Sequence, residues 1–167
     1  MQTDIMDRIA EFRVLAPVNI EGAIRSLGID LRKNCTDLEA GISGQIRRLP
    51  DGRFEISTPR TEHYFRQRFT MAHELGHYIL HRDLIGDGLD DDQMYRSTQH
   101  GRFYNTAIKL VHESQANAFA ANFLMPEDLV RRVVESEGRD MKQLMARFQV
   151  SPSAMNWRLK SLSLPEV

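Results

Sequence analysis

The stretch "FTMAHELGHYILH", residues 69–81, belongs to a helical pattern that runs over residues 61–81. It places His73 and His77 four residues apart, with Glu74 directly after the first histidine. Residues i and i+4 lie about 40° apart around a helix axis, so the two imidazoles project from one face and can reach a single metal ion. Glu74 lies beside that pair, where a general base acts on water next to the ion.

Chance is a weak explanation of this H-E-x-x-H pattern, because a chain of this composition is expected to contain it only about 0.01 times. A purely structural interpretation stays open. In it, the two histidines pack on a half-buried helix face and Glu74 is a surface charge. A third metal ligand in the sequence would distinguish the two interpretations.

Catalytic zinc sites use three protein ligands and keep one position open for water or substrate. Asp83 stands where a metzincin motif has its third histidine, so that arrangement is excluded. His81 lies on nearly the same helix face as His77, but three ligands on two turns of one straight helix do not easily surround an ion tetrahedrally. We therefore expect His81 to cap or pack the helix end.

A better third ligand comes from a second helical stretch, "VHESQANAFAANFLMPEDL", which contains Glu113 and Asn117 at i, i+4 spacing. Alanines surround these two residues, and small side chains let two helices approach closely. Glu113 is then the candidate third ligand. Asn117 is a candidate acceptor for the second ring N–H of a ligating histidine, which would fix its tautomer. His112 competes with Glu113 for the ligand role, although it points about 100° away around the helix.

The remaining pattern predicts an α+β fold, mainly helical, with a small antiparallel sheet before the H-E-x-x-H helix. Residues 41–59, "GISGQIRRLPDGRFEISTP", are typical of a β-hairpin with its turn at "LPDG". The connection over residues 85–103 is rich in glycine and aspartate, so we expect a loop that is solvated or gates the site. Further helices are expected at residues 5–16, 20–27, 105–124, 141–148 and 152–162.

Composition bounds the class of protein. The chain has 167 residues, 41% hydrophobic and 27% charged, which suggests one domain over residues 1–167. The net charge of -1 gives no overall attraction to nucleic acid or anionic membranes. Cys35 is the only cysteine, which excludes an internal disulfide and a cysteine-based metal site. No stretch has the apolar length of a signal peptide or a membrane span, so we expect a cytoplasmic protein without membrane contact.

Two blocks carry a family resemblance: "RQRFTMAHELGHYILH", residues 66–81, and "ESQANAFAANFLMP", residues 113–126. They closely resemble the ImmA/IrrE family of metallopeptidases, and the lead-in "APVNIEGAIRSLGI" with the hairpin fits the usual start of that domain. The resemblance implies a zincin-like fold with a gluzincin-like Zn2+ site. Carried onto this sequence, the zinc ligands are His73, His77 and Glu113, and Glu74 activates water. Gluzincins often have an aspartate where Asn117 stands.

The resemblance also implies a protein substrate. Characterised members of the family cleave helix-turn-helix repressors, often encoded nearby in mobile elements, toxin and antitoxin pairs or stress-response loci. A zinc peptidase also needs a donor for the oxyanion that develops on the substrate. The candidates for that donor are His100, Tyr104, Tyr64 and Tyr95.

A different function is suggested by residues 139–164, where two short helices around "QVSPS" look like a helix-turn-helix. This subregion carries an excess of four positive charges, so direct DNA binding by a regulatory protein with structural zinc is the alternative. Packing of these helices on the catalytic core, with their charges solvated, explains the same pattern. The basic residues are Arg139, Lys142, Arg147, Arg158 and Lys160, against Asp140 alone.

A third class is an interaction protein that keeps zinc only to hold its fold together. Glu74 distinguishes this class from a peptidase, because a structural zinc site has no need of a base beside its ligands.

Overall fold

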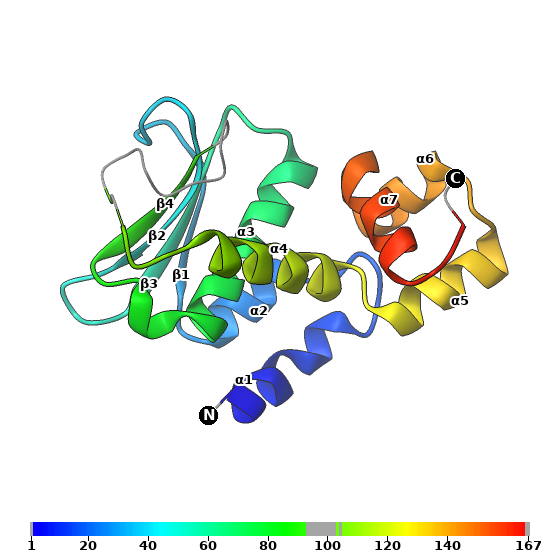
Figure 1. The fold of residues 1–167 in the computed structure, drawn as a ribbon, viewed down its shortest axis with the longest axis horizontal. Helices are drawn as coiled ribbons and strands as arrows, with labels where there is room; N and C mark the ends of the chain where they lie inside the picture. Colours follow the sequence, from blue (N-terminus) through cyan, green and yellow to red (C-terminus); the bar gives the residue numbers. More distant parts are fainter. Residues whose placement is uncertain (1, 93–102, 104, 166–167) are drawn as a thin grey trace.

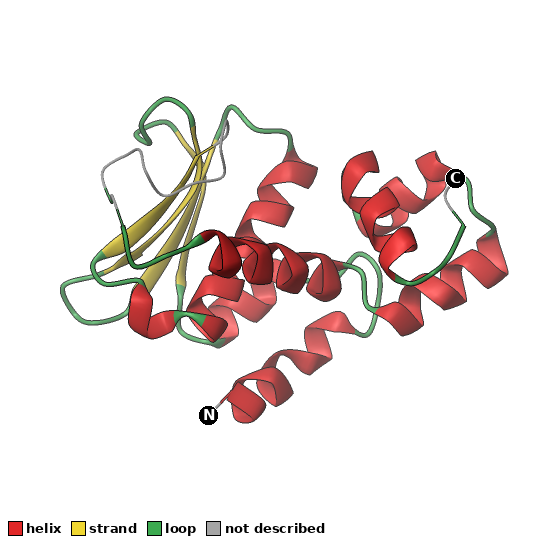
Figure 2. Cartoon of the chain, in the orientation of Figure 1, coloured by secondary structure: helices red, strands yellow, loops and turns green. Residues whose placement is uncertain are grey.

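The computed structural model describes residues 2–92, 103 and 105–165 and has an α+β fold that is mainly helical, as predicted (Figure 1). A sheet lies at one end of the molecule and a group of three helices at the other, with two long helices between them (Figure 2). The helices are α1 (Gln2–Ile9), α2 (Ile20–Ser26), α3 (Tyr64–Leu80), α4 (Leu110–Leu124), α5 (Glu127–Glu137), α6 (Met141–Phe148) and α7 (Pro152–Ser161), with short 3-10 helices at Ala10–Arg13 and Arg82–Leu84.

The sheet has the order β1-β3-β2-β4, with β1 (Asp30–Cys35), β2 (Ile42–Arg48), β3 (Phe54–Pro59) and β4 (Gly88–Asp92). The predicted hairpin is confirmed as β2 and β3, which pair antiparallel with Ile46 opposite Ile56. The predicted antiparallel sheet is found in β3, β2 and β4, and β1 adds a strand parallel to β3 that makes the sheet mixed. The chain reverses direction between β1 and β2 and again between β2 and β3, so β1 meets the free edge of β3 running the same way.

The prediction of a loop over residues 85–103 is wrong for β4, which forms an edge of the sheet against β2. Its aspartates suggested a solvated segment, but Asp90 and Asp91 are buried in the protein. Asp90 accepts hydrogen bonds from the Gln45 side chain at 2.7 Å and from the Phe103 backbone at 2.9 Å. Leu89, on the same strand, is buried in the core. An acidic segment becomes a strand here because the edge of β2 supplies both backbone and side-chain partners.

The helix boundaries follow their caps. Helix α3 begins at Tyr64 because the His63 side chain accepts a hydrogen bond from the Phe65 backbone. Helix α4 begins five residues later than predicted, because the Asn105 side chain binds the backbone of Ala107 and of Leu84, which fixes a turn there. The predicted first helix ends at Ile9 and continues only as a 3-10 helix.

The C-terminal helices are joined to the rest of the molecule through buried arginines. Arg158 on α7 donates to the carbonyl of Met125 at the end of α4, at 2.8 Å. Arg68 on α3 donates to the carbonyl of Gln149 between α6 and α7, at 3.3 Å, and to that of Val18 at 2.8 Å. Both guanidinium groups therefore fix the position of α7 relative to α3 and α4. The apolar residues of α6, α7 and the turn between them are buried: Leu144, Phe148, Val150, Met155 and Leu159.

Among the residues that the structure describes, no helix has the length and apolar composition that crossing a membrane requires.

Candidate metal centre

Helix α3 carries two histidines into the interior of the protein. His73 and His77 are both buried, and their ring centres lie 4.7 Å apart. Their Nε2 atoms face each other at 3.1 Å. The i, i+4 spacing thus brings the two imidazoles to one point, as the sequence predicted.

Helix α4 adds a carboxylate to this pair. The Oε2 atom of Glu113 lies 3.2 Å from Nε2 of His73 and 3.6 Å from Nε2 of His77. The approach of the helices depends on Gly76, since a Cβ there would lie 3.0 Å from Cδ1 of Phe119 and 3.3 Å from the backbone of Ala116. A small residue on α3 therefore faces a small residue on α4 and lets Glu113 reach the histidines.

The separations of these three atoms suit a tetrahedral metal. Bonds of about 2.0–2.1 Å at tetrahedral angles place neighbouring ligand atoms about 3.3–3.4 Å apart. The three distances found here, 3.1, 3.2 and 3.6 Å, bracket that value. We call His73, His77 and Glu113 the metal triad. Two imidazoles and a carboxylate are also the donor types that a catalytic zinc site uses.

The Nδ1 atom of His73 is held by Asn117. It lies 3.0 Å from the amide oxygen of Asn117, which can only accept a hydrogen bond. His73 therefore carries its proton on Nδ1 and turns the lone pair of Nε2 toward Glu113. This is the role that the sequence predicted for Asn117.

His77 is held by two successive hydrogen bonds, through His81 to Gln115, that the sequence did not predict. His81 Nε2 lies 2.8 Å from the Gln115 side-chain oxygen, and Nδ1 of His77 lies 3.0 Å from Nδ1 of His81. Because the amide oxygen only accepts, His81 donates from Nε2 and accepts at Nδ1. His77 must then donate from Nδ1, which leaves the Nε2 lone pair free to bind a metal. His81 does end α3, as expected, but it also orients His77.

Three electron pairs converge in the metal triad, so it requires a cation or a proton. Burial lowers the pKa of His77 to about 4, which keeps that ring neutral. Burial acts to raise the pKa of Glu113, but the two histidines beside it outweigh burial and bring the pKa to about 2. Burial also acts to lower the pKa of His73, yet Glu113 and Asp91 raise it overall. The ionised Glu113 thus favours a positive charge among the three ligand atoms of the metal triad.

Glu74 lies beside the metal triad, and no positively charged group or hydrogen-bond donor of the described residues pairs with its carboxyl group. The side chain is fully buried, and neither carboxylate oxygen has a hydrogen-bond partner among the described residues. Burial raises the pKa of Glu74 well above its ordinary value, and the nearby charges of Asp91 and Glu113 add to the effect. Gly44 on β2 makes room for this group, because a Cβ there would lie 3.3 Å from Oε1 of Glu74. A buried carboxylate of this kind is suited to proton transfer.

Asp91 on β4 is a member of the site that the sequence did not predict. One of its carboxylate oxygens accepts a hydrogen bond from Ser43 at 2.9 Å. It also forms, with His73 and Glu74, a group whose ligand atoms lie within 4.8 Å of one another. The signal was the aspartate run in "GLDDD", which composition alone assigned to a loop.

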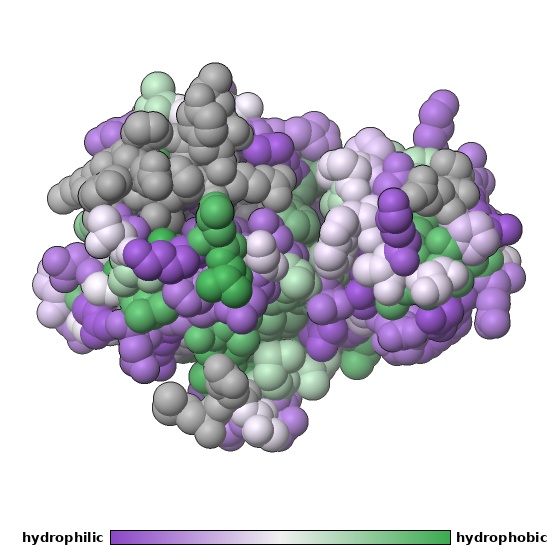
Figure 3. Space-filling view, in the orientation of Figure 1, coloured by the Kyte–Doolittle hydropathy of each residue, from purple (hydrophilic) through white to green (hydrophobic). Residues whose placement is uncertain are grey.

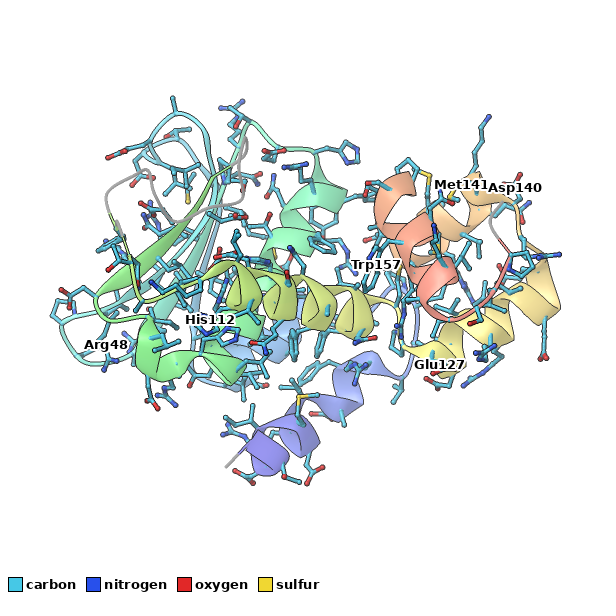
Figure 4. The ribbon with its side chains drawn as sticks, viewed as in Figure 1. Arg48, His112, Glu127, Asp140, Met141 and Trp157 are labelled. Atoms are coloured by element: carbon cyan, nitrogen blue, oxygen red, sulfur yellow. The ribbon has the colours of Figure 1, made fainter. Side chains whose placement is uncertain are left out.

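The other candidate residues lie away from the metal triad or outside the described residues. His112 lies at the beginning of α4 (Figure 4), and its Nδ1 accepts a hydrogen bond from the Lys109 backbone at 3.0 Å. His112 therefore caps α4, while Glu113 faces the histidines. Tyr64 begins α3, more than two turns before His73, and its hydroxyl donates to Glu21 at 3.3 Å. His100, Tyr95 and Tyr104 lie outside the described residues.

Comparison with known families and proteins points to one family. A family model described as the IrrE N-terminal-like domain (Peptidase_M78) matches residues 59–160, more than half of the chain. The chain is 36% identical over 97 residues to the radiation response metalloprotease IrrE of Deinococcus radiodurans, which covers 56% of this chain and 27% of that protein. It is 31% identical over 105 residues to the same-named protein of Deinococcus deserti, covering 61% of this chain and 34% of the relative. The match thus spans about a third or less of each relative's length.

A solved structure shares the fold. A Mycobacterium tuberculosis transcriptional regulator superposes with a TM-score of 0.62 over 95% of this chain and 46% of that one, at 19% sequence identity. At this identity the likeness concerns the fold alone.

Proposed function

Because the chain belongs to the family of the IrrE N-terminal-like domain (Peptidase_M78), we propose that it is a zinc-dependent endopeptidase. One observation carries the proposal: two imidazole nitrogens and a carboxylate oxygen converge within 3.6 Å beside a buried carboxylate that has no hydrogen-bond partner in the described chain. The convergence fits a metal ion, and the second carboxylate fits a general base. A site that used zinc only to stabilise the fold would have no use for Glu74.

The chemistry divides between the metal and the chain's own residues. A zinc ion on the metal triad supplies a Lewis acid, which lowers the pKa of water toward 7 and polarises a peptide carbonyl. Glu74 would be the carboxylate beside that ion, and a positive charge there would favour its ionised form. Glu74 then takes one proton from the attacking water as the oxygen bonds to the carbonyl carbon. The C–N bond breaks, and Glu74 delivers the proton to the departing amine.

We further propose that the substrate is a regulatory protein, such as a helix-turn-helix repressor or an antitoxin encoded nearby. The family resemblance of the two motif blocks supports this class of substrate. The radiation-response names of the two relatives are consistent with a regulatory setting.

The basic residues of the C-terminal helices argue against DNA binding as the main function. Arg158 is buried, and its guanidinium is used by the Met125 carbonyl. Arg147 forms an ion pair with Glu137 at 3.5 Å. The positive charge that α6 and α7 can offer to a phosphate backbone is therefore smaller than the sequence suggested.

A cleavage assay with the full chain tests the proposal. The protein is stripped of metal, reloaded with zinc, and mixed with a helix-turn-helix regulator encoded beside it, and the products are identified by mass spectrometry. We expect one zinc per chain, cleavage at a defined bond, and no cleavage with a chelator. The Glu74→Gln variant should keep its zinc and lose at least about a hundredfold in rate. Failure of the stripped protein to bind zinc, or undiminished cleavage by the variant, would refute the proposal.

A mobility-shift assay tests the DNA alternative. Steeply salt-dependent binding of the full chain to duplex DNA at nanomolar concentration would favour it. We expect only weak binding that is lost at physiological salt.

A further inference from the structure

A pocket of about 490 Å³ lies between α7 and the two helices that carry the metal triad, α3 and α4. Its volume falls within the range of roughly 300–1,000 Å³ that is typical of ligand sites. Pale and green residues gather between the two halves of the molecule in the space-filling view (Figure 3). The lining residues come from α3, α4 and the beginning of α7: Arg66, Phe69, Ser114, Asn117, Ala118, Ala121, Ser151, Ser153, Ala154 and Trp157.

The pocket is continuous with the metal triad. A narrow recess next to it is lined by His73, Asp91 and Thr70, and it shares Arg66, Phe69 and Asn117 with the pocket. Asn117 is also the residue that holds the ring of His73, at 3.0 Å. A peptide whose carbonyl lies at the metal triad can therefore place a neighbouring side chain in the pocket.

The walls of the pocket combine apolar and uncharged polar side chains. Phe69, Trp157 and three alanines supply carbon surface, and the remaining polar members except Arg66 are uncharged. Trp157 is 49% exposed, which is unusual for so large an apolar side chain. Figure 4 places it on the side of α7 that faces α3 and α4. Arg66, whose Nε lies 3.1 Å from Glu62, is the one charged residue of the lining.

We propose that this pocket binds a large apolar side chain of the substrate, aromatic or long aliphatic, next to the bond that is cut. Trp157 is its specificity-determining wall. This inference rests on the proposed peptidase function, because the metal triad positions the substrate backbone. Apolar walls stabilise an apolar side chain by removing it from water, and Arg66 disfavours a basic one.

The place of α7 supports this occupant. Arg158 and Arg68 help to fix α7, which forms one wall of the pocket, against α4 and α3 through the carbonyls of Met125 and Gln149. The exposed face that carries Trp157 consequently looks into the same space as the catalytic residues. A peptide bound at the metal triad can reach this side chain, because the pocket and the recess beside His73 share lining residues. A DNA duplex would need α7 to present its exposed face away from the core.

Binding of amino-acid hydroxamates tests the inference. A hydroxamate chelates zinc and so anchors each probe at the metal triad, while the side chain varies among Phe, Leu, Ala and Lys. Trp157 is the only tryptophan of the chain, so its fluorescence reports what enters the pocket. Dissociation constants for the zinc-loaded full chain are measured by calorimetry. We expect the Phe and Leu probes to bind about tenfold to a hundredfold more tightly than the Ala probe and to shift the emission to shorter wavelength.

Two variants test whether the pocket causes the preference for the Phe probe over the Ala probe. Trp157→Ala removes the wall, and Ala154→Phe fills the pocket from α7, far from the metal triad. Both should bring the Phe-to-Ala preference close to one while the Ala probe binds as before. Leu80→Ala is the control, because Leu80 is a similarly exposed apolar residue, 39% accessible, at the opposite end of α3 from Phe69. It should leave the preference unchanged.

The outcomes distinguish a failure of the metal triad from a failure of the pocket assignment. If no hydroxamate binds to the zinc-loaded protein, the metal triad and with it the proposed function fail. If all four bind equally well, or if the Phe preference persists in both pocket variants, the metal centre stands and the pocket assignment is overturned.

Discussion

The Nδ1 atoms of His77 and His81 lie 3.0 Å apart, so one metal-facing histidine is oriented by another histidine. The Gln115 side-chain oxygen lies 2.8 Å from His81 and determines which nitrogen donates in each of these hydrogen bonds. This acceptor-only group thus fixes which nitrogen of His77 faces Glu113. The partner of His73, in contrast, is a single amide.

His81→Ala should weaken zinc binding by about tenfold to a hundredfold, because loss of a partner behind a metal ligand has that effect in other sites. The fold should persist, as His81 lies at the end of α3. Competition with a fluorescent chelator measures the affinity. His63→Ala is a matched control: it removes an exposed histidine from the other end of the helix and should not change zinc affinity. Equal affinity of the His81 variant and the native chain would show that His77 needs no partner.

Substitution of Asn117 should move zinc affinity in two directions. Asn117→Ala removes the acceptor of the His73 N–H and should weaken binding by about tenfold or more. Asn117→Asp keeps the acceptor and adds a negative charge, which raises the basicity of His73 and should strengthen binding severalfold. Both affinities are measured at the same pH and ionic strength. Weaker binding by the aspartate variant would mean that repulsion among the acids of the site outweighs the gain at His73.

The stability of the metal-free protein should depend on pH through Glu74. Burial raises its pKa in the folded state above the ordinary value of 4.5. The folded protein therefore retains a proton that the unfolded chain loses, and stability falls as pH rises above about 4.5 toward the folded-state pKa. Glu74→Gln removes this penalty. Urea unfolding in a chelator should give a stability advantage of the variant that is small at pH 4.5 and larger at pH 8. A constant difference would contradict the prediction.

Enlarging Gly76 should damage the metal triad more than the fold. Gly76→Val places methyl groups against Phe119 and the Ala116 backbone, where even one Cβ meets atoms at 3.0 and 3.3 Å. The variant should push α4 from α3, carry Glu113 away from the histidines and lower zinc affinity at least tenfold, with circular dichroism unchanged in shape. Gly76→Ala should lie between the variant and the native chain. Native zinc affinity in the valine variant would show that the helix approach is not what positions Glu113.

The sequence was most informative where one helix determines the geometry. His73 and His77 follow from the i, i+4 rule with Glu74 beside them, and the alanines of the second helix together with the family resemblance favoured Glu113 as their partner. The alternation of apolar and polar residues likewise predicted the buried hairpin. All of these are short-range regularities, in which the residue type and its spacing already contain the physical cause.

The features that were missed depend on contacts between distant segments. Strand β4 forms because Gln45 and the β2 edge accommodate aspartates that otherwise favour a loop. The partnership of His81 with Gln115 spans 34 positions of sequence. Trp157 lines a pocket only because α7 lies beside α3 and α4 in the folded protein. No local propensity predicts such pairings, because their stability arises from packing that the folded chain creates.

The arginines that fasten α7 bind main-chain carbonyls, at Met125 and Gln149, and not side chains. Every residue offers the same carbonyl, so this attachment tolerates drift in the amino acids around it. Position 157 can therefore vary among descendants of this chain without disturbing the ligands on α3 and α4, as long as Arg158 and Arg68 are kept. Preference for a new target and the capacity to hydrolyse it are inherited on separate helices, which lets one evolve while the other stays fixed.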